Sequence, residues 1–197
     1  MHMARLPSRG APMLGEPLPI ELGNTMYAVR GRLRDGLQTV EHLAAWLHDM
    51  RTRLPMALSD SDLADLTEAN LAAARQIRQA VRLLAAATVD GISLDPEAVA
   101  TLNQQAGRVP RWRELWLDPE PHLVVCGTGR PVGAVLAALA EEALALFAGP
   151  HRQDLCACRG PGCVLFFVRD HPQRHWCSAG CGNRARAARY YARNRRA

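Results

Sequence analysis

Residues 176–197 read WCSAGCGNRARAARYYARNRRA, and this stretch decides how the C-terminal part of the chain folds. It contains Cys177 and Cys181, with three residues between them, and continues into a helix-like segment rich in arginine. A second close pair, Cys158 and Cys163, lies upstream, with thirteen residues between the two pairs. Tetrahedral Zn²⁺ takes four such sulfur donors. The sequence therefore predicts one zinc ion, with Cys158, Cys163, Cys177 and Cys181 as its ligands.

The segments around the two pairs predict how the sulfurs converge. The glycines and proline of RGPG (159–162) allow a tight turn, so that both sulfurs of the first pair face inward. VLFFV (164–168) predicts a strand, DHPQ (170–173) a turn, and RHW (174–176) a second strand. The second pair lies where a helix begins, and the free amides there favour thiolates. A knuckle, a β-hairpin and a helix start around one metal predict a treble-clef-like zinc finger.

Other uses of the cysteines are open from the sequence. They could form two disulfides, a redox switch or an iron–sulfur cluster. We favour zinc because the N-terminus has no recognisable secretory signal, and clustered cysteines in a reducing cytoplasm usually bind metal. Cys156 could replace Cys158 as a ligand, and His171 or His175 could also coordinate the ion. We expect Cys126, outside the cluster, to be a small buried apolar residue.

The sequence predicts a non-enzymatic protein. Four sulfurs leave a zinc ion no open position for a substrate, so such a metal is structural. The best enzyme-like pattern is GTGRPVG (127–133), but its glycine spacing differs from that of a dinucleotide-binding loop, and Pro131 lacks an amide for a phosphate. A turn from a strand into a helix explains it better. No run of 18 apolar residues occurs, so we expect no membrane span.

Charge divides the chain into an acidic and a basic part. Residues 1–150 carry a net charge of −3, whereas residues 151–197 carry ten arginines, two aspartates and a net charge of +8. Helical spacing places four of these arginines on one stripe: Arg186, Arg189, Arg193 and Arg196. Such a stripe is either a solvated face or a surface for a polyanion, and we expect DNA. We expect Arg184 to brace the finger by pairing with Asp170.

The rest of the chain predicts a mainly α protein with one small hairpin. Residues 1–17 suggest a flexible tail, 18–149 a helical domain, and 150–197 the finger, with the boundary at Gly149–Pro150. Apolar periodicity and capping residues predict helices over 38–50, 59–91, 93–107 and 131–149. Residues 18–34 suggest a short helix or strand with a turn at 23–24. Alternation predicts a hairpin with strands near 112–117 and 122–126.

Cys-Gly-Asn-Arg (181–184), preceded by Arg-His-Trp-Cys-Ser (174–178), resembles the signature of the CGNR zinc finger proteins. The acidic body resembles their partner domain, ABATE, whose N-terminal pattern is similar to Glu-Leu-Gly-Asn-Thr (21–25). The resemblance extends over roughly residues 18–197. Two features depart from it: the last pair has three intervening residues where many members have four, and Cys156 is additional.

The resemblance implies a bacterial regulator of transcription under stress. Its finger would bind DNA, and its body would sense a small-molecule or protein effector or a partner, with a homodimer as one arrangement. Asn24, Thr25 and Arg30 could line an effector pocket in the body, or Asn24 and Thr25 could cap a helix. A protein-interaction module with a structural zinc, and an RNA-binding protein, are the alternatives. Binding that weakens steeply with salt would favour nucleic acid, and a preference for single strands would favour RNA.

Overall fold

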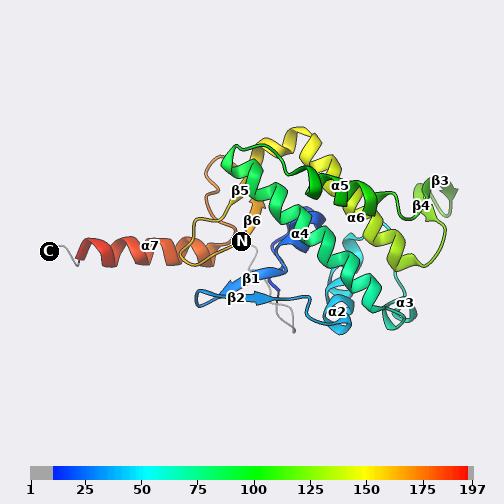
Figure 1. Cartoon of the computed structure of the whole chain (residues 1–197), viewed down its shortest axis with the longest axis horizontal. Coiled ribbons are helices and arrows are strands. Elements are labelled where there is room, and N and C mark those ends of the chain that lie inside the picture. Colours follow the sequence, from blue (N-terminus) through cyan, green and yellow to red (C-terminus); the bar gives the residue numbers. More distant parts are fainter. Residues whose placement is uncertain (1–10, 195–197) are drawn as a thin grey trace.

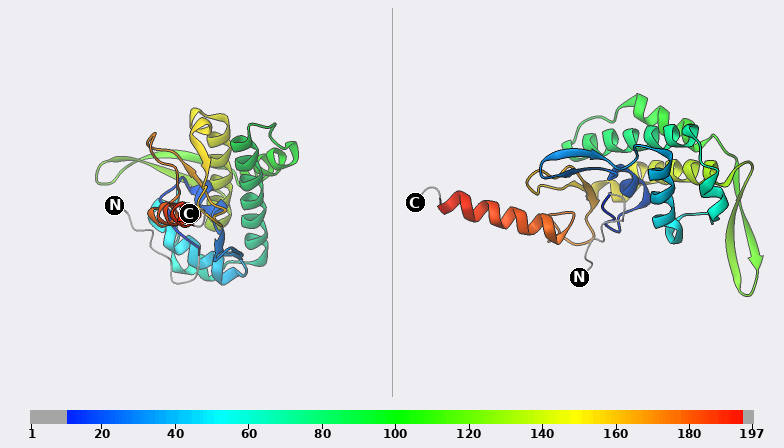
Figure 2. Two further views of the ribbon diagram at one scale, coloured as in Figure 1. Left: turned by 90° about the vertical axis from the view of Figure 1, so that its left-hand side faces the viewer. Right: turned by 90° about the horizontal axis from the view of Figure 1, so that it is seen from below.

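The computed structural model describes residues 11–194, and its architecture is mainly α, as predicted (Figure 1). The helices of the body lie side by side, while a long C-terminal helix and a β-hairpin project from opposite ends (Figures 1 and 2). The α-helices are α1 (Leu18–Gly23), α2 (Val40–Met50), α3 (Asp60–Ala64), α4 (Glu68–Asp90), α5 (Pro96–Ala106), α6 (Pro131–Ala148) and α7 (Ala179–Asn194). Short 3₁₀ turns cover Arg51–Arg53 and Pro150–Asp154.

Capping residues fix where the body helices begin. Thr39 accepts a hydrogen bond from the His42 amide before α2, and Asp95 accepts one from Glu97 before α5. Pro131 occupies the first turn of α6. These helix starts confirm the sequence-based predictions.

The prediction of one helix over 59–91 is wrong, because two helices occupy this range. Ser59 and Asp62 form a capping box that begins α3, but this helix ends after five residues. Thr67 and Asn70 form a second capping box, which begins α4. Gly91 ends α4 with a left-handed backbone (φ 66°), the conformation that glycine adopts most easily.

The main core lies where α1, α4, α5 and α6 pack against one another. α6 has the length and apolar composition of a membrane-spanning helix, but 61% of its 18 residues are buried inside the protein. Its leucines, alanines and valines pack against Ile77, Val81 and Leu84 of α4 and Leu102 of α5. A helix that is apolar on nearly all sides is one that other helices surround.

Within residues 11–194, three separate antiparallel hairpins complete the fold. They are β1 (Met26–Val29) with β2 (Arg32–Asp35), β3 (Arg111–Leu117) with β4 (Pro121–Gly127), and β5 (Leu155–Ala157) with β6 (Phe166–Val168). β3 and β4 confirm the predicted body hairpin. The β1–β2 hairpin was not predicted; its turn holds Arg30 and Gly31 at φ 51° and 75°, as a two-residue hairpin turn requires.

The finger contains a different hairpin from the one predicted. β6 lies within the predicted strand 164–168, but its partner is β5, with Leu155 opposite Val168 and Ala157 opposite Phe166. Residues 174–176 do not form a strand. The first cysteine pair therefore lies in the loop that joins the two strands of this hairpin.

Several contacts attach this hairpin to the body. Leu155 and Phe166 belong to the same apolar cluster as the body helices. The side chain of Asn24 donates to the Phe166 carbonyl (2.8 Å) and accepts from the Phe166 amide (2.9 Å), as a neighbouring strand would. Arg82 of α4 donates to the carbonyl of Val164 (3.3 Å). The division at 149–150 stays a prediction, but the two parts share one core.

The expected flexible tail is wrong for residues 11–17, and residues 1–10 lie outside the described part of the chain. Ala11 and Glu16 are buried. Glu16 accepts from the Val168 amide (2.8 Å) and pairs with Arg174, so this segment contacts the finger. Because Glu16 and Arg174 are 158 residues apart in sequence, no local sequence pattern reveals this contact.

A second buried ion pair fixes the β1–β2 hairpin on α4. Arg78, which is 7% exposed, donates both terminal nitrogens to the carboxylate of Asp35. Burial raises the pKa of Asp35, but the hydrogen bonds from Arg78 and from the Leu37 amide outweigh it and leave that pKa below its usual value. The pair therefore stabilises the fold above the unfolded pKa of an aspartate, and its contribution is lost as the pH falls through the folded pKa.

Candidate metal centre and nucleic-acid interface

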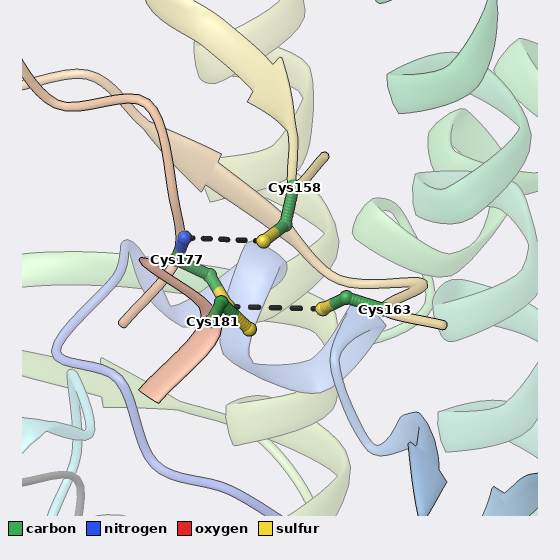
Figure 3. Close-up of side chains that lie close together, drawn as sticks. All are labelled: Cys158, Cys163, Cys177 and Cys181. Carbon is green, nitrogen blue, oxygen red and sulfur yellow. Dashed lines mark hydrogen bonds between the residues drawn. The ribbon is translucent and has the colours of Figure 1, made fainter. Parts of the chain in front are cut away.

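The four predicted cysteines converge at the foot of α7 (Figure 3). Their sulfur atoms all lie within 4.8 Å of one another, with 3.8 Å between Cys163 and Cys177 and 3.4 Å between Cys177 and Cys181. Four sulfurs about 2.3 Å from a tetrahedral zinc ion would be about 3.8 Å apart. The cluster therefore has the size of a zinc site.

The first pair lies on a tight knuckle between β5 and β6. The Cys158 amide donates to the Leu165 carbonyl (2.8 Å), and the Cys163 amide donates to the Gly160 carbonyl (2.9 Å). A Cβ atom at Gly160 would lie 2.8 Å from the Cβ of Cys181, which is too close for any side chain. The predicted RGPG turn thus needs its first glycine so that α7 can approach the knuckle.

The second pair spans the start of α7, with Cys177 two residues before the helix and Cys181 on its first turn. The Ser178 hydroxyl accepts a hydrogen bond from the Cys181 amide (3.3 Å), as a helix-capping serine does. Gly182 lies under the indole of Trp176, where a Cβ would come within 3.2 Å of the ring. In the Cys-Gly of the signature, the cysteine therefore supplies a sulfur to the cluster and the glycine leaves room for the Trp176 ring.

The sulfurs are too close together for all four to be thiolates without a cation. The neighbouring sulfurs, Cys158 first, raise the pKa of the Cys177 thiol far above its usual value, and the pKa of Cys163 is raised in the same way. A divalent cation removes this conflict because it favours the ionised form of each ligand. The chemistry of the donors thus agrees with their spacing.

Two N–H donors point at sulfurs of the cluster, one from the backbone and one from an arginine side chain. The Cys177 amide lies 3.4 Å from the sulfur of Cys158, and Arg184 places a terminal nitrogen 2.9 Å from the sulfur of Cys181. Arg184 therefore contacts the cluster, but the predicted pairing with Asp170 is wrong. Asp170 lies 3.5 Å from Arg174 instead. A guanidinium beside a thiolate offsets part of the negative charge that four sulfurs bring to one divalent ion.

The cluster fits one structural zinc ion. It contains Cys158 rather than Cys156, and neither His171 nor His175 belongs to it. All six cysteines lie in the described part of the chain, and none of them forms a disulfide. Cys126 was expected to be buried but is partly exposed on β4, because the β3–β4 hairpin projects away from the core.

The arginine stripe lies on the projecting part of α7. Arg186, Arg189 and Arg193 are exposed and line one shallow groove with Ala192, whereas Arg196 lies outside the described residues. Only Cys181 and Gly182 of this helix are buried. The chain contains no aspartate or glutamate after Asp170, so no acidic residue of α7 offsets these charges.

The residues proposed for an effector pocket are not brought together. Asn24 is fully buried, and the nitrogen and the oxygen of its side-chain amide both bond to the backbone of Phe166, while the Thr25 hydroxyl donates to the Leu22 carbonyl (2.7 Å). Arg30 is exposed at the tip of the β1–β2 turn. Asn24 caps the C-terminal end of α1 and joins it to β6, so its role is structural. A single sequence could not reveal this, because Phe166 is 142 residues away.

Sequence reasoning missed the ion pair of Glu16 and Arg174, which lies beside the metal centre. Arg174 also donates to the Val168 carbonyl (3.1 Å), and its guanidinium lies 4.8 Å from the centre of the Phe167 ring. Burial raises the pKa of Glu16, although the Val168 amide and the charge of Arg174 oppose this effect. These contacts bind the segment before Cys177 to the N-terminal part of the chain.

Comparison with known families identifies both parts of the chain. A family model described as "Putative stress-induced transcription regulator", ABATE, matches residues 16–150. A second, described as the CGNR zinc finger, matches residues 155–194. No curated protein matches the chain. The cysteine cluster, the arginine of the CGNR signature beside it and these two matches together show that the chain belongs to the ABATE family and carries a CGNR zinc finger.

Proposed function

We propose that this protein is a cytoplasmic regulator that binds DNA through α7, with zinc fixing the foot of that helix. The observation that carries the proposal is the exposed stripe of Arg186, Arg189 and Arg193 on a helix without carboxylates. The stripe occupies a helix that projects clear of the body (Figure 1). An unpaired row of guanidinium groups is stabilised by phosphates, and arginine also makes two-pronged contacts with guanine.

Salt dependence tests this proposal without knowledge of the target sequence. Fluorescence anisotropy would follow a labelled random 30-base-pair duplex titrated with the zinc-loaded chain at several salt concentrations. If four arginines contact phosphates, we expect the logarithm of the binding constant to fall with that of salt with a slope of roughly −3 to −4. The variant Arg186→Ala/Arg193→Ala should make this slope shallower by about 2.

A matched control separates local contacts from overall charge. Arg113→Ala/Arg130→Ala removes the same two charges from the opposite end of the molecule, where both arginines are exposed. We expect this control to bind almost as the parent chain does. Binding that ignores salt would contradict DNA recognition and favour a docking module, and a preference for single strands would favour RNA.

The body supplies a surface that favours contact with another protein. The β3–β4 hairpin projects from it and exposes Trp112, Leu115, Trp116, Leu117 and Leu123. An isolated two-stranded hairpin is only marginally stable in water, so a partner that covers it would stabilise it. We infer that the body acts as the sensor or partner domain and that this hairpin is its contact surface.

A second copy of the chain is the simplest partner for this surface. Light scattering would then give twice the 21.6 kDa mass of one chain, and Leu115→Ser/Leu117→Ser should return it to a single mass. A single-chain mass at every concentration would contradict the homodimer and leave a different protein as the partner.

A further inference from the structure

An open groove of about 730 Å³ lies between the base of α7 and the rest of the finger. One wall consists of Ala185, Ala188 and Arg189 on α7. The opposite side comes from β5, from the knuckle and from Arg169, the residue that follows β6. The groove is not part of the metal centre, although the knuckle contributes to both.

The groove carries three arginines that take part in no ion pair among the described residues. Arg159 and Arg169 are exposed on the finger, and Arg189 faces them from α7. Within residues 11–194 none of the three forms an ion pair, and no aspartate or glutamate lines the groove. Arg174 also lines it, but Glu16 and Asp170 already pair with that arginine. The groove is therefore suited to an anion with several charges.

The surface between these arginines is largely apolar. Trp176 and Phe167 lie on its floor, and the two alanines leave the α7 wall without long side chains. Phosphates separated by sugars present this alternation of charge and apolar surface, and phosphate contacts commonly fix the position of a protein on DNA. A simple inorganic anion would use the arginines but not the tryptophan.

Arg189 connects this groove with the arginine stripe. It lines both the groove and the shallow surface that contains Arg186 and Arg193. The basic surface therefore continues from the tip of α7 to the knuckle without an intervening carboxylate among the lining residues.

Duplex geometry places a strand at this position. A helix with its side chains is about 10–12 Å wide and fills a major groove about 12 Å wide, so one sugar–phosphate strand runs along each side of it. With α7 in a major groove, the strand nearer the body would run along the base of α7, where this groove opens. We propose that the groove seats this strand, with Arg159 and Arg169 contacting its phosphates and Trp176 packing on its sugars. This proposal rests on the proposed function, because it assumes that α7 binds duplex DNA.

The variant Arg159→Ala/Arg169→Ala tests the groove directly. With the full zinc-loaded chain and the labelled random duplex, we expect about a tenfold loss of affinity at low salt and a salt slope shallower by about 2. Within residues 11–194 neither side chain forms an ion pair or belongs to the sulfur cluster, so the variant should keep one zinc ion per chain. The control is again Arg113→Ala/Arg130→Ala, which changes the net charge equally.

The outcomes separate this proposal from the proposed function. Parent-like affinity and slope for Arg159→Ala/Arg169→Ala, together with weakened binding for Arg186→Ala/Arg193→Ala, would overturn the groove while DNA binding by α7 stands. Equal losses in the groove variant and the control would also overturn it, because net charge alone would explain them. Competition by inorganic phosphate at concentrations that leave ionic strength unchanged would assign the groove to a small anion instead. No duplex binding by the parent chain would overturn both proposals.

Discussion

Cys181→Ser should release the zinc and unfold α7, with loss of DNA binding. This cysteine contributes a sulfur to the cluster and is one of two buried residues of the helix. A structural zinc ion contributes about 10–16 kcal/mol to the folding of a small module, and a sixteen-residue helix without packing is marginal in water. Metal analysis should fall from one zinc ion per chain towards zero, and circular dichroism should show a loss of helix.

The effect should also reach the body. Leu155 and Phe166 pack in the main core, so a loosened finger hairpin exposes part of that core. A loss of about 2 kcal/mol there would lower the melting temperature of the body by about 4–8 °C. A melt with two transitions would support the division predicted at residues 149–150, and one shared transition would contradict it.

Cys156→Ser is the matched control for the metal. Cys156 lies two residues from Cys158 and is partly buried, but its sulfur is outside the cluster. This variant should keep one zinc ion and the helix content of the parent. If Cys156→Ser lost zinc and Cys181→Ser kept it, the proposed set of four ligands would be wrong.

Asn24→Ala should give the largest loss of stability outside the metal centre. It removes two hydrogen bonds to Phe166 and leaves a buried amide and a buried carbonyl without partners. Each unpaired buried group costs about 1–3 kcal/mol, so we expect the free energy of unfolding to fall by about 2–4 kcal/mol. Urea unfolding followed by circular dichroism would measure it, and Asn103→Ala at an exposed helical position should change it by less than about 0.5 kcal/mol.

The variant Asn24→Asp tests the same bridge through the pH dependence of its stability. The new carboxylate can accept from the Phe166 amide but repels the Phe166 carbonyl, and its burial raises its pKa. When folding raises the pKa of a carboxyl group, the protein has its full stability at pH values below the pKa of that group in the unfolded chain. This stability is lost as the pH rises through the pKa of the group in the folded protein. Asn24→Asp should therefore be less stable than Asn24→Ala at pH 7 and should recover as the pH falls. Equal stability of Asn24→Asp at all pH values would show that Asn24 does not bridge to β6.

Local signals were enough to predict most of the helices. Thr39, Asp95 and Pro131 begin three of them where capping and proline rules placed their starts. The interruption before α4 was missed because the second capping box begins with a threonine and uses an asparagine in place of glutamate. The apolar period on both sides of Thr67 is similar, so periodicity alone did not reveal the break.

Contacts between distant parts of the chain could not be predicted in this way. β5 has only three residues, too few to show the alternation of a strand, so the finger hairpin was assigned a wrong partner. Glu16 and Asn24 contact the finger across more than 140 residues, and neither side chain belongs to a motif that points there. The cysteine spacing, by contrast, placed all four sulfurs correctly, because metal ligands come in pairs that are close in sequence.

α7 is attached to the rest of the protein at one end alone, so any change in its tilt occurs about the sulfur cluster. Sixteen helical residues extend about 24 Å, so a tilt of roughly 10° at the foot displaces the far tip by about 4 Å. That displacement exceeds the tolerance of a guanidinium–phosphate contact, which spans about 3 Å. The stiffness of a few metal–sulfur bonds therefore sets how accurately the distal arginines meet their target. A larger ion bound by the same four sulfurs would change the direction in which α7 projects, although every arginine of the helix would still be present.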